Sequence, residues 1–166
     1  MKNFLLISVG IAVLDQLTKQ MIVRNLDLCE FGFCDSIELL PFLKLILVYN
    51  DGAAFSILSD AGGWQRWFLS LVSFSVSGFI FFWIFRLKPS ERLLGFALAI
   101  ILGGAIGNLI DRVLLGHVVD FILLYHSDFF FPTFNVADTA ISVGAILLII
   151  EMFIKKKGRD EHGNNT

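Results

Sequence analysis

Four long apolar runs, separated by shorter polar stretches, set the pattern of this chain. They cover residues 4–23, 67–85, 93–112 and 136–154. Each run holds about 20 residues, the length an α-helix needs to cross the hydrocarbon core of a bilayer. No Pro/Ser-rich linker separates them, so residues 1–166 are expected to form one domain. The pattern therefore predicts four transmembrane helices in a single integral-membrane domain.

The first apolar run also has the outline of a secretory signal peptide, because a basic residue precedes it. Asp15 and Lys19 interrupt the apolar core that a signal peptide needs, however, and no small-x-small cleavage site follows. We therefore expect a retained helix. Asp15 and Lys19 lie four residues apart on one helical face, where their charges can pair. They are either a mutually neutralising pair or supports for a polar site, and the sequence leaves both interpretations open.

The segment between the first and second runs, residues 26–65, is acidic and mixed in character. Residues 37–50 (IELLPFLKLILVYN) are rich in branched apolar side chains and are broken at Pro41, which predicts one or two short strands. Residues 50–56 (NDGAAFS) then favour a turn that leads into a short helix. A small sheet on the bilayer surface is therefore expected outside the four helices.

The composition agrees with a membrane protein. Hydrophobic residues make up 56% of the 166 residues, Phe occurs 18 times and the mean hydropathy is +0.76. This is more apolar surface than a soluble domain of this size buries. No basic stripe suggests a nucleic-acid partner. Cys29 and Cys34 have no second Cys pair or nearby His, so a zinc site is not supported, and whether they form a disulfide stays open.

Lys and Arg concentrate at one end of the predicted helices. Residues 86–92 hold three of them, residues 155–159 hold four and Lys2 adds another, whereas residues 113–135 hold none. Since cytoplasmic loops carry the excess of positive charge, both termini are expected in the cytoplasm. The acidic first loop and residues 113–135 would then face outward. The polar end, residues 155–166, is expected to be a disordered cytoplasmic tail.

The stretch from Gly103 to Asp138 departs most from what apolar packing requires. Within it, Asn108, Asp111 and Arg112 are spaced i, i+3, i+4, so they share one face at the outer end of the third predicted helix. Asp111 and Arg112 are either a structural ion pair or part of a polar site. Ionisable groups in or beside a membrane are costly and are usually functional.

Three further polar residues follow in the same stretch. Asn135 is well placed to cap the fourth helix, and Asp138 would lie in its first turn, where the helix dipole favours a carboxylate. A purely structural role is therefore open for Asp138. Asp120 has no such explanation, because it lies in an apolar, uncharged segment, residues 117–124 (HVVDFILL), of the loop at residues 113–135. Residues 128–134 (DFFFPTF) of this loop are interpreted as interfacial. An acid in these surroundings is expected to have a raised pKa.

We take Asp120 and Asp138 as the working pair. Two carboxyl groups at the same depth would share one proton, and such a pair contains both the acid and the base that peptide hydrolysis needs. No Ser or Cys lies near a His in a recognisable arrangement. His117, His126 and His162 lack metal-ligand spacing, so neither a metal nor an organic cofactor is expected.

Four blocks of the sequence stand out together. They are DQLTK at residues 15–19, NDGAAF at 50–55, GNLIDRVLLGHVVDFI at 107–122 and FNVAD at 134–138. In this order, and over nearly the whole chain, they closely resemble the lipoprotein signal peptidase (signal peptidase II) family of aspartic membrane peptidases. One departure is the Cys-bearing segment LCEFGFCDSIELLP at residues 28–41, which is longer than expected before the family's strands and leaves the four blocks intact.

The resemblance implies a fold and a role for individual residues. The fold would be four transmembrane helices with a small periplasmic sheet that cradles the substrate. Asp120 and Asp138 would form the catalytic dyad. The positions that would bind substrate or support the dyad are Asn108, Asp111, Arg112, Asn135, Asn50, Gly52, Asp15 and Lys19.

The resemblance also implies an activity: removal of the signal peptide from a bacterial prolipoprotein, by cleavage just before its diacylglyceryl-modified Cys. Implied partners are these substrates, membrane lipids and globomycin-type inhibitors. The protein would be a monomer in the bacterial inner membrane, with its active site at the periplasmic face. An alternative is a small proton-coupled transporter in which Asp15, Lys19, Asp120 and Asp138 relay protons. It predicts mid-membrane charges and internal repeats, neither of which is clear in the sequence.

Overall fold

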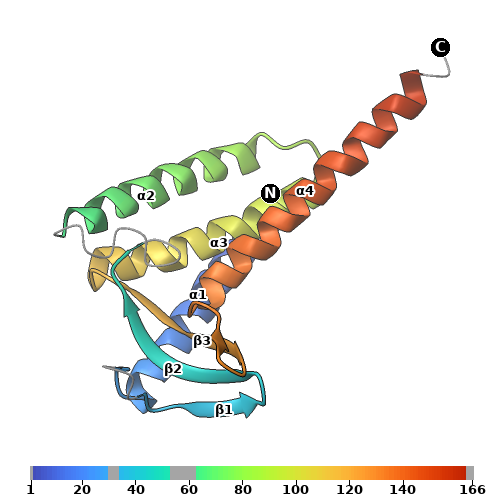
Figure 1. Cartoon of the computed structure of the whole chain (residues 1–166). Coiled ribbons are helices and arrows are strands. Elements are labelled where there is room, and N and C mark those ends of the chain that lie inside the picture. The colour runs from blue at the N-terminus through green and yellow to red at the C-terminus, as the bar shows by residue number, and fades with distance from the viewer. Residues whose placement is uncertain (1, 30–33, 53–62, 164–166) are drawn as a thin grey trace.

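Four long helices form the body of the protein, and a small sheet lies beside one end of them (Figure 1). The computed structural model describes residues 2–29, 34–52 and 63–163. The helices are α1 (Lys2–Asn25), α2 (Trp64–Phe85), α3 (Arg92–Leu114) and α4 (Val136–Gly163). Each contains a stretch long and apolar enough to cross a membrane. The predicted membrane fold of four helices with a small sheet is confirmed.

α3 lies at the centre of the helical part and contacts each of the other three helices. Two adjacent glycines allow this close approach. A Cβ atom at Gly103 would lie 2.7 Å from the carbonyl oxygen of Ser8 on α1, and one at Gly104 would collide with the carbonyl oxygen of Ala137 on α4. A larger side chain at either position would push a neighbouring helix away. The two glycines therefore let α3 hold α1 and the start of α4 close together.

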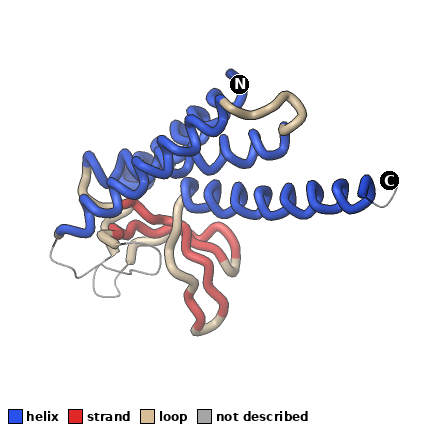
Figure 2. Tube along the Cα trace, turned by 90° about the horizontal axis from the view of Figure 1, so that it is seen from above, coloured by secondary structure: helices blue, strands red, loops and turns tan. Residues whose placement is uncertain are grey.

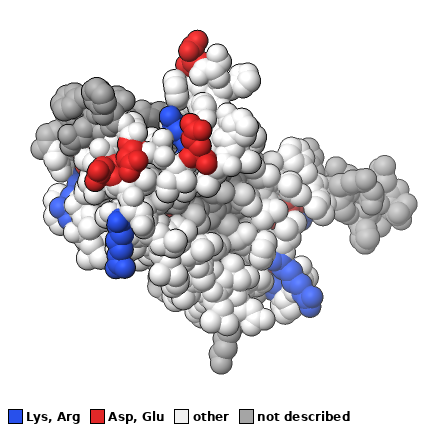
Figure 3. Space-filling view, turned by 90° about the horizontal axis from the view of Figure 1, so that it is seen from below, with Lys and Arg blue, Asp and Glu red and all other residues white. Residues whose placement is uncertain are grey.

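The outward surface of α2 is strongly apolar. Phe74, Phe79 and Phe82 are 67%, 65% and 69% exposed. Figure 3 shows that Lys, Arg, Asp and Glu side chains cover only a small part of the face that it draws. Exposed apolar surface of this extent is unfavourable in water and favourable in contact with lipid. The helices are therefore built to be surrounded by a bilayer.

The sheet is antiparallel, in the order β1-β2-β3-β4. Its strands are β1 (Ile37–Leu40), β2 (Leu43–Asn50), β3 (Val118–His126) and β4 (Phe129–Phe130). The two strands predicted from residues 37–50, with a break at Pro41, are confirmed. Figure 2 shows the sheet next to the first turns of α4, which then runs away from it.

The segment that carries Asp120 is a strand, which the sequence placed only within a loop between two helices. Val119 and Phe121 of β3 pack against Ile22 and Leu26 of α1 in a buried apolar cluster. Side chains alternate along a strand, so Asp120 points to the opposite face of the sheet. The first four residues of β3 are all buried. A strand buried on both faces lacks the alternation of polar and apolar residues by which half-buried strands are recognised.

The segment after α1 is closed by a disulfide and joined to the sheet by a hydrogen bond. Cys29 and Cys34, whose pairing the sequence left open, are joined by a disulfide. The N–H of Cys29 also donates to the carbonyl oxygen of Leu47 on β2 at 2.9 Å. Residues 30–33 of the extended segment, and residues 53–56 of the small-residue turn, lie outside the described residues.

α4 continues as a helix to Gly163. It therefore passes the expected end of the fourth span at residue 154 and enters the segment that we predicted to be a disordered tail. At this end Lys155 forms an ion pair with Glu91 at 2.9 Å, which links α4 to the start of α3. The side of the membrane on which the termini lie stays a prediction from the distribution of Lys and Arg.

Candidate active site

The fold brings Asp120 and Asp138 to one cavity. Asp120 lies on β3, and Asp138 lies in the first turn of α4. Both line a cavity of about 520 Å³, together with Asn50, Asn108 and Arg112. Asp120 is only 1% exposed. The two acids that we predicted to work together therefore have access to a common space.

The first turn of α4 fixes Asp138 through a reciprocal pair of hydrogen bonds. The N–H of Asp138 donates to Oδ1 of Asn135 at 2.9 Å, and the N–H of Asn135 donates to Oδ2 of Asp138 at 3.3 Å. This is a capping-box arrangement, with Asn135 as the N-cap and Asp138 three residues later. Asp138 therefore has the structural role that its position suggested, in addition to its place in the cavity.

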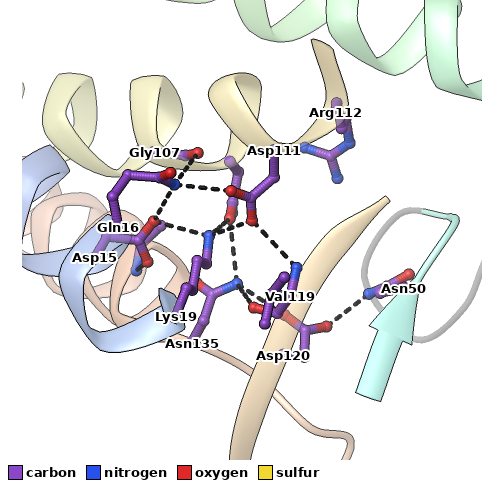
Figure 4. Close-up of polar contacts among 12 residues, drawn as sticks. Asp15, Gln16, Lys19, Asn50, Gly107, Asp111, Arg112, Val119, Asp120 and Asn135 are labelled. Atoms are coloured by element: carbon purple, nitrogen blue, oxygen red, sulfur yellow. Dashed lines mark hydrogen bonds and ion pairs between the residues drawn. The ribbon is translucent and has the colours of Figure 1, made fainter. Parts of the chain in front are cut away.

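Two asparagine side chains connect the acids. Nδ2 of Asn135 donates to Oδ1 of Asp120 at 2.7 Å, a bond that Figure 4 shows from the labelled residues. Nδ2 of Asn108 donates to Oδ1 of Asp138, also at 2.7 Å. Nδ2 of Asn135 lies 3.1 Å from Oδ1 of Asn108, and this contact joins the Asn135–Asp120 pair to the Asn108–Asp138 pair. Asp120 and Asp138 are thus held in one hydrogen-bond network.

The end of β2 holds Asp120 from the other side. Nδ2 of Asn50 donates to Oδ2 of Asp120 at 2.9 Å. Val48 is the pairing partner of Asp120, so Asn50 lies diagonally beside Asp120 on the same face of the sheet. The N–H of Gly52 donates to Oδ1 of Asn50 at 3.0 Å, and Nη2 of Arg112 donates to the carbonyl oxygen of Gly52 at 3.3 Å. Arg112 and the turn after β2 therefore meet beside the cavity.

A buried ion cluster lies behind the asparagines (Figure 4). The ammonium nitrogen of Lys19 lies 2.7 Å from Oδ2 of Asp15, 2.8 Å from Oδ2 of Asp111 and 2.9 Å from Oδ1 of Asn108. Oδ1 of Asp15 accepts the N–H of Ala137 in the first turn of α4 at 2.9 Å. Asp15 and Lys19 therefore neutralise each other and also contact the site, so both interpretations of this pair apply.

The ion-pair partner of Asp111, in the described part of the chain, is Lys19 on α1 and not its sequence neighbour Arg112. Oδ2 of Asp111 also accepts the N–H of Val119 at 3.1 Å. Val119 directly precedes Asp120 on β3. Asp111 thus fixes the strand next to the candidate catalytic acid, while Arg112 is left to face the cavity.

Gln16 belongs to this cluster, and the sequence pattern did not single it out. Its Nε2 donates to Oδ1 of Asp111 at 2.7 Å and to the carbonyl oxygen of Gly107 at 3.2 Å. The available signal was a polar residue next to Asp15 on an otherwise apolar helix. Its role depends on which face of α3 packs against α1, and the helix pattern alone does not reveal that.

Arg66, in the first turn of α2, was also missed. Its Nε donates to the carbonyl oxygen of Arg112 at 2.8 Å, and its Nη2 donates to that of Val113 at 2.7 Å. A cation is favourable at these last carbonyls of a helix. Gly116, with φ of +95°, lies beside the guanidinium, and a Cβ there would be 3.2 Å from Nη1. Arg66 therefore anchors the turn of α3 that carries Arg112.

Neither His117 nor His126 lines the cavity. His117 stacks on the ring of Tyr49, with 4.0 Å between the ring centroids. Within residues 2–29, 34–52 and 63–163, no group of three His, Cys, Asp or Glu side chains is arranged to hold a metal ion. The charged side chains that line the cavity are those of Arg112, Asp120 and Asp138.

Burial raises the pKa of Asp120 from an ordinary 3.8 to about 7. Hydrogen bonds from Asn50 and Asn135 oppose this rise, as does the positive charge of Lys19, whereas the negative charge of Asp138 adds to it. Near neutral pH this carboxyl group therefore keeps a proton much of the time. Next to a second carboxyl group, it can supply the acid half of an acid–base pair.

The cavity combines a polar end with an apolar wall. Asn50 and Arg112 lie at the polar end, near the two acids. The apolar wall is formed by Leu124, Phe131, Pro132, Phe134, Ile141, Val143 and Ile146. Such a space suits a ligand that has both a polar part and an apolar part.

The sequence matches the family model described as signal peptidase (SPase) II over residues 7–154. The chain belongs to the signal peptidase II family. A relative from Ectopseudomonas mendocina (strain ymp), named lipoprotein signal peptidase, is 50% identical over 160 residues, which is 95% of this chain and 92% of the relative. A relative of the same name from Pseudomonas aeruginosa (strain UCBPP-PA14) is 47% identical over 96% of this chain and 94% of its own length.

Solved structures agree with the assignment to the signal peptidase II family. One, described as a bacterial membrane enzyme, has a TM-score of 0.79 and 32% identity, and the match covers 95% of this chain and 92% of that one. A second with the same description has a TM-score of 0.73 and 34% identity, over 92% and 93% of the two chains. The family resemblance drawn from the four sequence blocks is therefore confirmed, and so is the implied arrangement of four long helices with a small sheet.

Proposed function

We propose that this protein is an aspartic endopeptidase that removes the signal peptide from bacterial prolipoproteins, cutting just before the diacylglyceryl-modified Cys. Membership of the signal peptidase II family supports the substrate class. The observation that carries the aspartic mechanism is that Asp120 and Asp138 line one cavity and are joined through Asn108 and Asn135.

In the proposed reaction the pair carries one proton, which we assign to Asp120 because burial raises its pKa to about 7. Asp138 is the carboxylate, since the N-terminus of α4 favours negative charge there. The oxygen of a water molecule attacks the scissile carbonyl carbon while Asp138 takes a proton from that water. Asp120 protonates the carbonyl oxygen. Asp138 then protonates the leaving nitrogen while Asp120 recovers its proton. The C–N bond breaks, and the pair returns to its starting state.

The two ends of the cavity suit the two parts of such a substrate. The peptide around the scissile bond would meet Asn50 and Arg112, whose N–H groups are able to bind carbonyl oxygens in addition to their present partners. The diacylglyceryl group and the apolar signal peptide would lie along the apolar wall between the sheet and α4. No metal or organic cofactor takes part in this mechanism.

The proposed location is the bacterial inner membrane, with both termini in the cytoplasm and the cavity at the periplasmic face. The support is the excess of Lys and Arg in residues 86–92 and 155–159, because cytoplasmic loops carry such charge. The proposed partners are lipidated prolipoproteins, membrane lipids and globomycin-type inhibitors, and the protein acts as a monomer.

A gel-shift assay tests this function. The purified protein in detergent or lipid is mixed with a diacylglyceryl-modified precursor and, separately, with the same precursor lacking the lipid. We expect conversion of the lipidated form to a smaller product and little conversion of the other, with globomycin blocking the first. Equal cleavage of both precursors, or no cleavage of either by folded protein, would refute the proposal.

Substitutions at Asn135 separate its two roles. Asn135→Ala should lower the free energy of unfolding by about 1 kcal/mol, because α4 loses its N-cap. Asn135→Ser restores a capping oxygen and should unfold at a higher temperature than Asn135→Ala. Both variants should process precursor much more slowly, because neither has the amide NH₂ group that donates to Asp120. Thermal unfolding checks the capping role of Asn135, and the gel-shift assay checks its hydrogen bond to Asp120. A fully active Ser variant would disprove the role of that hydrogen bond.

A further inference from the structure

The two acids impose the direction of their hydrogen bonds only while they are ionised, and in the proposed cycle each of them carries a proton at one stage. A carboxamide is nearly symmetric in shape, and a half-turn exchanges its oxygen and its NH₂ group. Asn108 and Asn135 both present NH₂ to a carboxyl group, at 2.7 Å in each case. If either side chain turned over, its oxygen would face an acidic oxygen, and the dyad would lose a donor. Some other group must therefore fix the direction.

For Asn135 the backbone does this. The N–H of Asp138 donates to Oδ1 of Asn135 at 2.9 Å, and a backbone N–H is only a donor. The oxygen of Asn135 is therefore held at the start of α4, and its NH₂ group is left for Asp120. This half of the network is fixed by the capping of the helix.

For Asn108 the nearer of two donors is the side chain of Lys19. The other is Nδ2 of Asn135 at 3.1 Å, whose NH₂ group also serves Asp120 at 2.7 Å and the carbonyl oxygen of Val119 at 3.3 Å. The ammonium of Lys19 lies 2.9 Å from Oδ1 of Asn108, and an ammonium is a donor with no acceptor. The same nitrogen meets Asp15 at 2.7 Å and Asp111 at 2.8 Å. Its three N–H bonds thus have three acceptors, and the side chain is only 2% exposed. With its oxygen held in this way, Asn108 has only its NH₂ group to offer to Asp138.

We propose that Lys19 is a positioning residue that sets the direction of the hydrogen bonds to the dyad, through the carboxamide of Asn108. It acts without touching the substrate. This goes beyond neutralising Asp15 and Asp111, since a role in charge balance requires only a positive charge, whereas this role requires a donor at the oxygen of Asn108. The inference rests on the proposed aspartic mechanism and deepens it.

The experiment compares two neutral side chains of similar length at position 19, one with an N–H donor and one without. Asp111→Asn is made in both, because removing the ammonium alone would leave Asp15 and Asp111 as two buried, unbalanced charges. In the wild type, Asp15, Asp111 and Lys19 have a formal sum of one negative charge. The double variants K19Q/D111N and K19M/D111N have the same sum, from Asp15. They therefore differ in the donor and are matched in formal charge.

We expect K19M/D111N to have a kcat at least about tenfold below that of K19Q/D111N, because a misdirected Asn108 misplaces Asp138. KM for the lipidated precursor should agree within about threefold, because the wall that holds the lipid is unchanged. Lys44→Met, on β2 and outside the cavity, is the control for loss of a lysine and should keep wild-type kcat. D111N alone is the baseline for both double variants.

Equal kcat values for the two double variants would overturn the positioning role, as would a loss expressed only in KM. If the Met variant does not fold, K19L/D111N takes its place, since it has the same formal charge and also lacks a donor. The same difference in kcat from K19Q/D111N is then expected, and equal kcat values would again overturn the inference. The proposed function fails separately, if variants of Asp120 and Asp138 remain active.

Discussion

Replacing Asp120 or Asp138 by Asn is expected to leave a folded membrane protein that accumulates uncleaved lipidated precursor. Each substitution keeps the size of the side chain and removes a group that must take up and release a proton. We expect the rate of processing to fall by at least about a thousandfold in each variant. The double variant should be no slower than either single variant by more than a few-fold, because the two acids act as one unit. The gel-shift assay on purified protein measures all three.

Asp128→Asn is the matched control for these variants. Asp128 is exposed in the turn between β3 and β4, and it does not line the cavity. Its substitution should leave processing unchanged. Normal processing by folded Asp120→Asn or Asp138→Asn protein would remove the dyad assignment, whatever the behaviour of the control.

The second large effect is that of Asp120→Asn on stability. The substitution is expected to raise stability although it lowers activity. Burial raises the pKa of Asp120 in the folded protein to about 7, above the ordinary 3.8 of an unfolded chain. Between these values the folded state binds more protons than the unfolded state, so this carboxyl group makes the fold less stable as pH rises from about 4 to 7. An asparagine side chain at this position would carry no such penalty, because it does not ionise. D120N should therefore be more stable than wild type at pH 8, by on the order of 3 kcal/mol.

Thermal unfolding in detergent, followed from pH 4 to pH 8, checks this. The advantage of D120N should be small at pH 4, should grow through the interval and should level off above pH 7. The oxygen of an asparagine at position 120 still accepts the NH₂ group of Asn135, so the substitution puts at risk only the bond from Asn50. A D120N protein that is less stable than wild type at pH 8, or an advantage that does not change with pH, would show that the surroundings do not disfavour the charged form of the buried acid.

The gain in stability and the loss of activity have one cause. A site that must keep a proton at neutral pH needs a carboxyl group where its charged form is disfavoured, and the fold bears that cost. Asp120 meets the condition because its side chain, on the face of the strand opposite to Val119 and Phe121, is itself only 1% exposed.

Much of the fold could be predicted from the sequence because bilayer length imposes a strong pattern. Four runs of about 20 apolar residues are typical of membrane-spanning helices and rare in soluble domains, and Pro41 divides the first two strands visibly. β3 was missed because residues 118–121 are buried on both faces and show no alternation. The end of α4 was misjudged because residues 155–163 are polar, and polarity alone does not distinguish a helix that leaves the membrane from an unfolded tail.

The site was predictable where a single residue conflicts with its surroundings. Asp120 in an apolar run and Asn135 three residues before Asp138 both carry a local signal. The partners of Lys19 could not be read in this way, because Asp111 and Asn108 reach it only when α1 packs on α3. Gln16 and Arg66 were missed for the same reason, since each acts on a helix distant in sequence. Local chemistry thus identifies the acids, and tertiary packing decides what holds them.

The most direct test of the proposed mechanism is mass spectrometry of the products formed from a diacylglyceryl-modified precursor in ¹⁸O-labelled water, under single-turnover conditions. The mechanism predicts one ¹⁸O atom in the new carboxyl group of the released signal peptide, an unlabelled protein, and a mature product that begins at the lipidated Cys. Cleavage at another bond, or ¹⁸O in the side chain of Asp120 or Asp138, would contradict direct attack by a water held between the two acids.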